Sequence, residues 1–293
     1  MTSPDGDPGR RRPFSFIGPD LIPRLLSAAV LVPVTAAALA LGGIYFALLV
    51  GAVLAGAFRE WENMITGARR VFPSVLLMGF IALAALAYPM SGPWASVAVI
   101  GVAVLVAAVA SAPARRWRIA GLIVFGAAVV AFLSIRGSSA AGIWAGLFLA
   151  VVVWSTDSGA YFIGRLLGGT KLSPEVSPSK TWSGAAGGLL FGTLGGLVVW
   201  VGAGYAMGTP APLVIGGLIS IVVSISGQAG DLAESALKRR FSIKDSGDII
   251  PGHGGLMDRI DSLTVAGLVL WLIGLAHRGL GAVPQGILLW AQS

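Results

Sequence analysis

Three uninterrupted stretches without a single charged side chain constrain this chain more than any other feature of its sequence. They cover residues 25–58, 71–114 and 181–230, which is 34, 44 and 50 residues. A helix needs roughly 20 apolar residues to cross the hydrocarbon core of a bilayer, so each stretch is long enough for two crossings. Glycine and proline cluster near the middle of each stretch, where a turn would separate two helices. These clusters are Gly42-Gly43, Pro89 to Pro93, and residues 208–212.

Three shorter apolar segments complete the pattern, at residues 119–135, 138 to about 156, and 262 to about 280. We therefore predict an all-α integral membrane protein with about nine transmembrane helices. The charge content agrees with this class, because 11% of the residues are charged whereas soluble domains carry about 25%. The chain has no Cys, which excludes disulfides and thiolate metal sites.

The distribution of Lys and Arg predicts the orientation. With nine helices and a cytosolic N-terminus, every Lys and Arg except Arg136 and Arg278 falls on the cytosolic side, as the positive-inside rule requires. This bias, with anionic lipid headgroups as a second cause, accounts for the net charge of +7, and no nucleic-acid-binding motif accompanies it. The orientation puts a polar active site at the cytosolic side. The Ala-, Gly- and Arg-rich composition favours a multi-pass protein of a bacterial inner (plasma) membrane.

We expect three regions along the chain. Residues 1–20 are polar and should form a disordered cytosolic tail. Residues 21–136 should form the N-terminal transmembrane helices, about five spans. Residues 137–293 should form a catalytic transmembrane domain of about four spans with two cytosolic loops. Every fourth residue from Gly184 to Gly196 is glycine, which lets another helix approach closely. Packing within the chain is the favoured interpretation, and a homodimer contact is the alternative.

The most polar segment lies between the last two predicted spans. From Asp231 to Asp261 it carries six of the thirteen acidic residues, five basic residues and His253. Ionisable groups are costly beside hydrocarbon, so such a cluster indicates a functional site. Asp231, Glu234 and Lys238 would share one face of a helix that leaves the membrane. A solvated helix end with i,i+4 ion pairs is the alternative interpretation.

Asp258 and Asp261 stand one helical turn apart at the start of the last span. With Asp231 they could supply the carboxylates that Mg²⁺ takes alongside phosphate oxygens. Helix capping and dipole compensation would explain one carboxylate there, but not two that flank Arg259. The glycines around His253 can expose backbone N–H groups to an anion, and the imidazole could itself donate to a phosphate.

Two further motifs precede this cluster. Asp157 follows an apolar segment in Asp157-Ser-Gly-Ala-Tyr161 and would lie at a membrane-depth helix end. The stretch Ser177-Pro-Ser-Lys180-Thr181-Trp precedes a predicted helix, whose N-terminus can bind an anion. An ordinary loop followed by a helix N-cap is the alternative interpretation.

Taken together, these motifs resemble the signature of the phosphatidate cytidylyltransferase (CDP-diacylglycerol synthase) family. The resemblance rests on Ser235-x-Leu-Lys-Arg-x4-Lys-Asp-x-Gly-x2-Ile-Pro-x-His-Gly-Gly-Leu-x-Asp-Arg-Ile-Asp261 and on the order of the two earlier motifs. Ser179 and Ser183 depart from the family's usual Ser-Pro-Lys-Lys-Thr-Trp-Glu-Gly form, so those two positions are not assigned a direct role.

The resemblance implies Mg²⁺-dependent transfer of a cytidylyl group from CTP to phosphatidic acid. The products would be CDP-diacylglycerol, for phospholipid biosynthesis, and pyrophosphate, and a monovalent cation such as K⁺ is a further expectation. The implied metal ligands are Asp231 and Asp258, with Asp261 beside them. The residues assigned to catalysis and phosphate binding are Lys238, Arg239, Lys244, His253, Arg259 and Asp261. Those assigned to nucleotide binding are Asp157, Ser177, Lys180, Thr181, Gly254 and Gly255.

Other classes of protein share parts of this pattern. A CTP-using membrane kinase, such as a polyprenol kinase, would transfer the γ-phosphoryl group and release CDP instead of pyrophosphate. A cation-coupled transporter also has intramembrane carboxylates and glycine-broken helices. It usually places its site near the membrane midplane with repeat symmetry, whereas the polar residues here gather at one face. A CDP-alcohol phosphotransferase is disfavoured because its D-x2-D-G-x2-A-R motif is absent.

Overall fold

The computed structural model describes residues 21–67, 72–110, 114–209, 212–243, 245–247 and 255–290. Within these residues the fold is almost entirely helical, with nine long helices and a short tenth. The long helices are α1 (Leu21–Leu41), α2 (Gly43–Thr66), α3 (Phe72–Ser91), α4 (Pro93–Ala110), α5 (Arg115–Arg136), α6 (Ala140–Leu167), α7 (Trp182–Met207), α8 (Leu213–Arg240) and α9 (Met257–Arg278). A 3₁₀ turn, η1 (Leu280–Ala282), leads into the short helix α10 (Val283–Leu288).

The helix breaks fall where the glycines and prolines predict them. Gly42 and Gly92 have φ angles of 65° and 83°, and they separate α1 from α2 and α3 from α4. Gly208, with φ 65°, ends α7 before α8 begins. These left-handed φ values are accessible to glycine at little cost, which explains why the helices stop at these positions.

Seven helices in the described part of the chain are long and apolar enough to cross a membrane: α2, α3, α5, α6, α7, α8 and α9. Shorter apolar stretches occupy Ala29–Leu41 in α1 and Pro93–Val109 in α4. Large apolar side chains stand exposed on many helices, with Val109 at 90% and Leu166 at 79%. Such surfaces are typical of helices that face lipid. The all-α membrane class is thus confirmed, while the expected nine spans stay a prediction.

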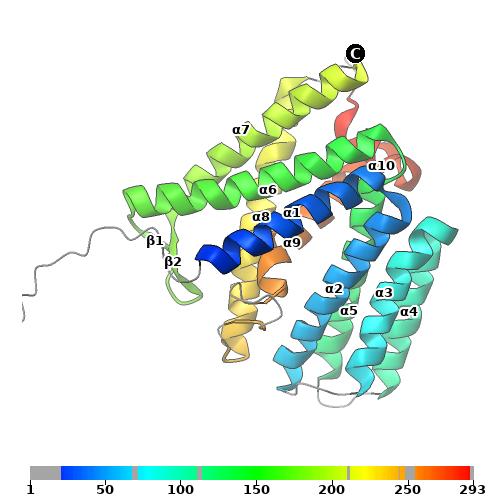
Figure 1. Cartoon of the computed structure of the whole chain (residues 1–293). Helices are drawn as coiled ribbons and strands as arrows, with labels where there is room; N and C mark the ends of the chain where they lie inside the picture. The colour runs from blue at the N-terminus through cyan, green and yellow to red at the C-terminus, as the bar shows by residue number, and fades with distance from the viewer. Residues whose placement is uncertain are drawn as a thin grey trace, which may run out of the picture.

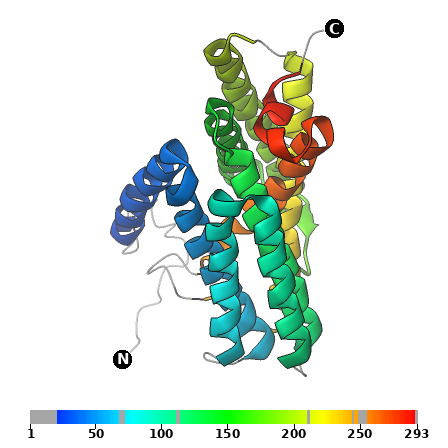
Figure 2. The ribbon, with the colours of Figure 1, turned by 90° about the vertical axis from the view of Figure 1, so that its right-hand side faces the viewer.

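The helices form two bundles with separate hydrophobic cores (Figure 1, Figure 2). α2 to α5 pack around residues such as Phe58 and Phe125. α6 to α10 pack around residues such as Phe148 and Leu270. α9 belongs to both bundles, because Met257 at its start is buried in the first core and Leu270 in the second. α1 lies to one side of the α2–α5 bundle (Figure 2).

The glycine row of α7 is used for packing within the chain. A Cβ at Gly184 would stand 2.9 Å from the carbonyl oxygen of Ala160, and one at Gly188 would stand 2.8 Å from that of Thr156, both on α6. Further along the row, the same face meets serine side chains of α8. The favoured interpretation of the glycine spacing is therefore correct for these helices, which approach too closely for larger residues.

Two features differ from the expectation. α6 does not end near Thr156 but continues to Leu167, so Asp157 lies inside the helix and not at its end. The chain then forms an antiparallel hairpin of β1 (Lys171–Ser173) and β2 (Ser177–Thr181), an exception within the all-α class (Figure 1). The predicted tail, residues 1–20, lies outside the described residues.

Candidate active site

A cavity of about 610 Å³ lies where α6, the hairpin, α7 and α8 meet. Its lining includes four residues from three separate sequence motifs: Asp157, Lys180, Thr181 and Asp231. Other polar side chains complete it, and sequence reasoning gave them no role: Tyr161, Arg165, Lys171, Ser179 and Gln228. The cavity thus joins the C-terminal half of α6 to the hairpin, α7 and α8, and it carries charges of both signs.

Lys180 and Asp231 form an ion pair across this cavity. The Lys180 Nζ atom lies 2.5 Å from Asp231 Oδ2, and the two side chains are 24% and 36% exposed. Next to Lys180, the hydroxyl oxygen of Thr181 accepts a hydrogen bond of 3.1 Å from the backbone N–H of Gly184. Thr181 is therefore the N-cap of α7, as the alternative interpretation of this motif has it, and it also lines the cavity.

A second ion-paired cluster forms where the last turn of α8 meets the first turn of α9. Lys238 Nζ lies 2.6 Å from Asp258 Oδ1 and 3.2 Å from Glu234 Oε1. All three side chains are largely buried, and Glu234 is only 6% exposed. The Lys238–Glu234 contact is the i,i+4 pair that a helix end favours, but its third member comes from another helix. The burial of these three side chains contradicts the alternative interpretation of a purely solvated helix end.

Asp258 also binds the backbone that leads into α9. Its Oδ2 atom accepts hydrogen bonds from the backbone N–H groups of Ser246, at 3.2 Å, and Gly255, at 3.1 Å. The carboxylate therefore accepts backbone hydrogen bonds near a helix N-terminus, as the capping interpretation proposes. Its other oxygen faces Lys238, so this one side chain has both a structural contact and a charged partner.

Asp261 links the two clusters. It interacts electrostatically with Asp231 and Asp157 on the cavity side, and with Glu234 on the other side. One of its oxygens accepts the N–H of Ser262 at 2.7 Å. Five carboxyl groups and two lysines therefore form one connected set across α6, β2, α8 and α9. Such a concentration of like charge is costly unless cations or ligands compensate it.

Comparison with known proteins identifies the family. Residues 22–276 match the cytidylyltransferase family. The chain belongs to this family. A phosphatidate cytidylyltransferase of Brucella suis biovar 1 is 37% identical over 256 residues, covering 86% of this chain and 92% of the relative. One from Bacillus subtilis strain 168 is 47% identical over 131 residues, covering 45% of this chain and 47% of the relative. The family predicted from the motifs is confirmed.

The donor chemistry of the site fits the Mg²⁺ ion that the resemblance implies. The carboxylates of Asp231 and Asp258 each face a lysine ammonium group, so a cation already lies beside both of them. Hard carboxylate oxygens are what Mg²⁺ prefers. In the described part of the chain, no three His, Asp or Glu side chains are placed to hold one metal ion together. A metal ion bound here would compete with Lys180 and Lys238 for these carboxylates.

The structure brings in one residue that sequence reasoning missed. Glu60, near the end of α2, is 1% exposed and accepts hydrogen bonds from Ser246, Leu256 and Met257, beside Asp258. The signal was present in the sequence, because Glu60 stands in Arg-Glu-Trp-Glu at the end of an apolar span. A carboxylate in that place is costly without a partner, but nothing in the sequence names the partner.

The remaining predicted residues are placed less centrally. Ser177 opens β2 and is not part of the cavity lining. Arg239 is exposed, and its Nε atom donates to the carbonyl oxygen of Val176 in the hairpin at 3.4 Å. Arg259 is exposed in the first turn of α9. Three more predicted residues lie outside the described residues: Lys244, His253 and Gly254.

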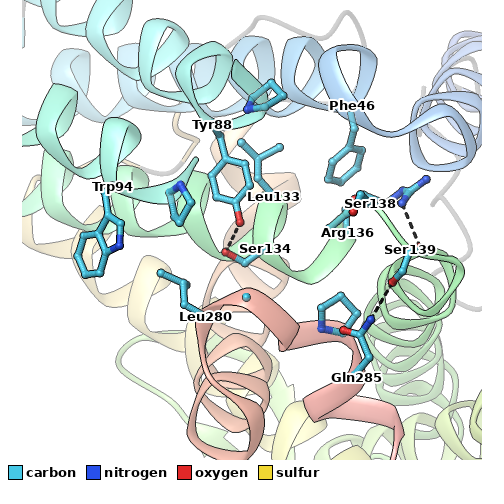
Figure 3. A pocket seen from close by; sticks show the side chains of 16 residues that line it. Phe46, Tyr88, Trp94, Leu133, Ser134, Arg136, Ser138, Ser139, Leu280 and Gln285 are labelled. Atoms are coloured by element: carbon cyan, nitrogen blue, oxygen red, sulfur yellow. Dashed lines mark hydrogen bonds between the residues drawn. The ribbon is translucent and has the colours of Figure 1, made fainter. Parts of the chain in front are cut away.

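A second cavity, of about 650 Å³, lies at the other ends of the helices (Figure 3). Tyr88 and Ser134 share a hydrogen bond of 2.9 Å there, and Gln285 donates to the Ser139 hydroxyl at 3.2 Å. Arg136 donates to backbone carbonyl groups at the end of α1. None of the residues predicted for chemistry lines this cavity.

Proposed function

We propose that this protein transfers the cytidylyl group of CTP to phosphatidic acid, giving CDP-diacylglycerol and pyrophosphate. The observation that carries the proposal is the pair of lysine–carboxylate contacts, Lys180–Asp231 and Lys238–Asp258, linked through Asp261 beside one cavity. Membership of the cytidylyltransferase family supports the nucleotide, and the names of the relatives support the lipid.

The chemistry needs little from a general base. A phosphate oxygen of phosphatidic acid attacks the α-phosphorus of CTP, and the bond from that phosphorus to the bridging oxygen of the β-phosphate breaks. The second ionisation of a phosphate monoester has a pKa of about 6, so the nucleophile is largely ionised at neutral pH. Catalysis then consists of holding two anions together in line and stabilising the departing pyrophosphate.

The lysines and carboxylates of the site match these tasks. Lys180 and Lys238 are the cations best placed to bind phosphates, since both already sit among carboxylates within the site. Asp231 and Asp258, with Asp261 beside them, are the residues that would hold Mg²⁺. Bound there, Mg²⁺ would neutralise phosphate charge and orient the leaving group. We assign the same phosphate-binding role to Arg239, Lys244, His253 and Arg259, and nucleotide contacts to Asp157, Ser177, Thr181, Gly254 and Gly255.

The surroundings of the cavity suit a lipid substrate. Tyr161 lines the cavity and is 58% exposed. Phe162 and Leu166 on α6 and Trp182 at the start of α7 are 67%, 79% and 61% exposed. Exposed apolar side chains beside a charged cavity allow acyl chains to stay in lipid while the phosphate reaches the lysines.

We further propose the membrane arrangement that the sequence predicts. It has about nine spans, a cytosolic N-terminus and an active site that faces the cytosol, in the inner (plasma) membrane of a bacterium. A homodimer and a K⁺ ion remain part of the proposal. Because the α7 glycine row packs against α6 and α8, a homodimer would use a different surface.

The position of the transferred phosphorus tests the proposal. Purified protein with phosphatidic acid and Mg²⁺ would be given CTP labelled with ³²P at the α-position, and in a parallel reaction at the γ-position. We expect the α-label in the lipid phase and the γ-label in pyrophosphate. A γ-label in lipid with release of CDP would mean a kinase and would contradict the proposal, as would absence of any lipid label with folded protein.

A further inference from the structure

Glu60 is a buried carboxylate, and within the described residues its side-chain hydrogen bonds come from the part of the chain around Asp258. It lies near the end of α2, in the bundle of α2–α5, and its side chain is 1% exposed. In the described part of the chain, none of the ion pairs involves Glu60. A buried carboxylate is costly unless hydrogen bonds satisfy it, so the groups that bind Glu60 indicate its structural role.

The partners of Glu60 are donors at the start of α9. The backbone N–H of Leu256 donates to Oε1 at 2.9 Å, and that of Met257 donates to Oε2 at 2.7 Å. The first N–H groups of a helix have no partner within the helix and carry partial positive charge. Leu256 is the N-cap residue and offers no side-chain cap. Glu60 therefore does the work of a cap from a different helix.

Glu60 also holds a second point of the chain. The Ser246 hydroxyl donates to Oε2 at 3.1 Å, and the Ser246 backbone N–H donates to Asp258. Two glycines leave room for the carboxylate, because a Cβ at Gly247 or Gly255 would stand 2.7 Å from a Glu60 oxygen. A side chain at either position would require Glu60 to move. The two glycines thus leave the space that the Glu60 carboxylate occupies.

We propose that Glu60 is a positioning residue for the transfer reaction. By fixing Ser246 and the first turn of α9, it holds Asp258 at its distance from Lys238, although Glu60 itself touches no substrate. The two Asp258 oxygens explain the dependence, since one faces Lys238 and the other accepts from Ser246 and Gly255. This inference rests on the proposed function of the same site.

Glu62 provides a matched comparison on the same helix. It is also 1% exposed, but it pairs with Arg118 at 2.7 Å and accepts from the Ser74 hydroxyl at 2.9 Å. Those partners lie within the α2–α5 bundle and not at the start of α9. Removing the charge of Glu62 should weaken the bundle without releasing Asp258.

The test compares Glu60→Gln, Ser246→Ala and Glu62→Gln with the wild-type full-length protein in detergent. In Glu60→Gln one carboxylate oxygen becomes an NH2 group, which would face the backbone N–H of either Leu256 or Met257 where an acceptor is needed. Turnover, the KM for CTP and the melting temperature are measured together with hydrogen–deuterium exchange of peptides that contain Leu256 and Met257. We expect Glu60→Gln to lower kcat/KM by about tenfold or more, because a misplacement of about 1 Å can cost that much.

The exchange measurement separates positioning from general stability. Glu60→Gln should speed exchange at Leu256 and Met257, and Ser246→Ala should lower kcat/KM by a smaller factor in the same direction. Glu62→Gln should lower the melting temperature and leave kcat/KM of the folded protein and exchange at α9 near the wild-type values. If Glu60→Gln does not fold, the activity and exchange of Ser246→Ala still test the inference.

The inference is overturned if Glu60→Gln or, failing that, Ser246→Ala leaves both kcat/KM and exchange at the start of α9 unchanged. It is also overturned if Glu60→Gln and Glu62→Gln lose activity only in proportion to folded protein. Failure of the proposed function would look different. The wild type would then transfer no cytidylyl group, while exchange at Leu256 and Met257 would still report whether Glu60 holds them.

Discussion

Gly255 shows at the scale of one residue how tightly the centre is packed. Its N–H donates to Asp258 Oδ2, and a Cβ at this position would stand 2.7 Å from Glu60 Oε2 and 2.9 Å from Asp258 Oδ2. The family resemblance assigned Gly255 to nucleotide binding. In this structure its N–H serves a carboxylate of the protein, and its missing side chain keeps two carboxylates in place.

Replacing Gly255 with alanine should therefore impair the reaction. The added methyl group must displace the Ser246 hydroxyl, at 1.9 Å, as well as Glu60 or Asp258, and overpacking of this kind costs about 1–3 kcal/mol. We expect Gly255→Ala to lower cytidylyl transfer per folded protein by about tenfold, as misplaced catalytic groups do. Gly101→Ala in α4 is the matched control, because a Cβ there meets nothing within 4 Å. Equal transfer rates in the two variants would contradict this account of Gly255.

At the scale of helices and strands, the predictable features are those that depend on local sequence. Apolar runs of sufficient length became helices, and Gly42, Gly92 and Gly208 became their breaks. The end of α6 was placed wrongly, because the polar side chains after Thr156 resemble a membrane exit although the helix continues through them. The β1–β2 hairpin was missed because its strands are three and five residues long and lack a clear alternation of polar and apolar residues.

The length of α6 bears on how the chain crosses the membrane. Its 28 residues extend about 42 Å at 1.5 Å per residue, which exceeds a hydrocarbon core of about 30 Å. In Figure 1, α6 is strongly inclined to the α2–α5 bundle. A tilted helix of this length can place the α5–α6 turn and the hairpin on opposite sides of the bilayer.

The sidedness of these two turns is testable because the protein has no Cys. Ser138 and Glu175 are both exposed, the first between α5 and α6 and the second in the hairpin turn. In intact cells, a membrane-impermeant maleimide should label Ser138→Cys. It should label Glu175→Cys only after the membrane is permeabilised. The reverse pattern, or labelling of both in intact cells, would contradict the proposed orientation.

At the scale of the whole molecule, the candidate site is assembled from segments far apart in the chain. Four of its charged residues stand out in the sequence against apolar surroundings: Asp157, Lys180, Asp231 and Asp258. The sequence contained no information on which lysine faces which carboxylate. Nor could it reveal the contact between Glu60 and Ser246, which are separated by 186 positions. Such pairings arise from the way α9 joins the two helix bundles, and tertiary packing alone determines them.

The central claim is that the two lysine–carboxylate pairs form one chemical centre, and substitution of both carboxylates tests it most directly. We would measure transfer of α-³²P label from CTP into phosphatidic acid for Asp231→Asn and Asp258→Asn, with Glu175→Gln in the exposed hairpin turn as control. Each Asn variant should lower turnover per folded protein by about 10²-fold or more, as loss of a charge-stabilising group does. Glu175→Gln should retain wild-type turnover. Wild-type turnover in either folded Asn variant would contradict the account.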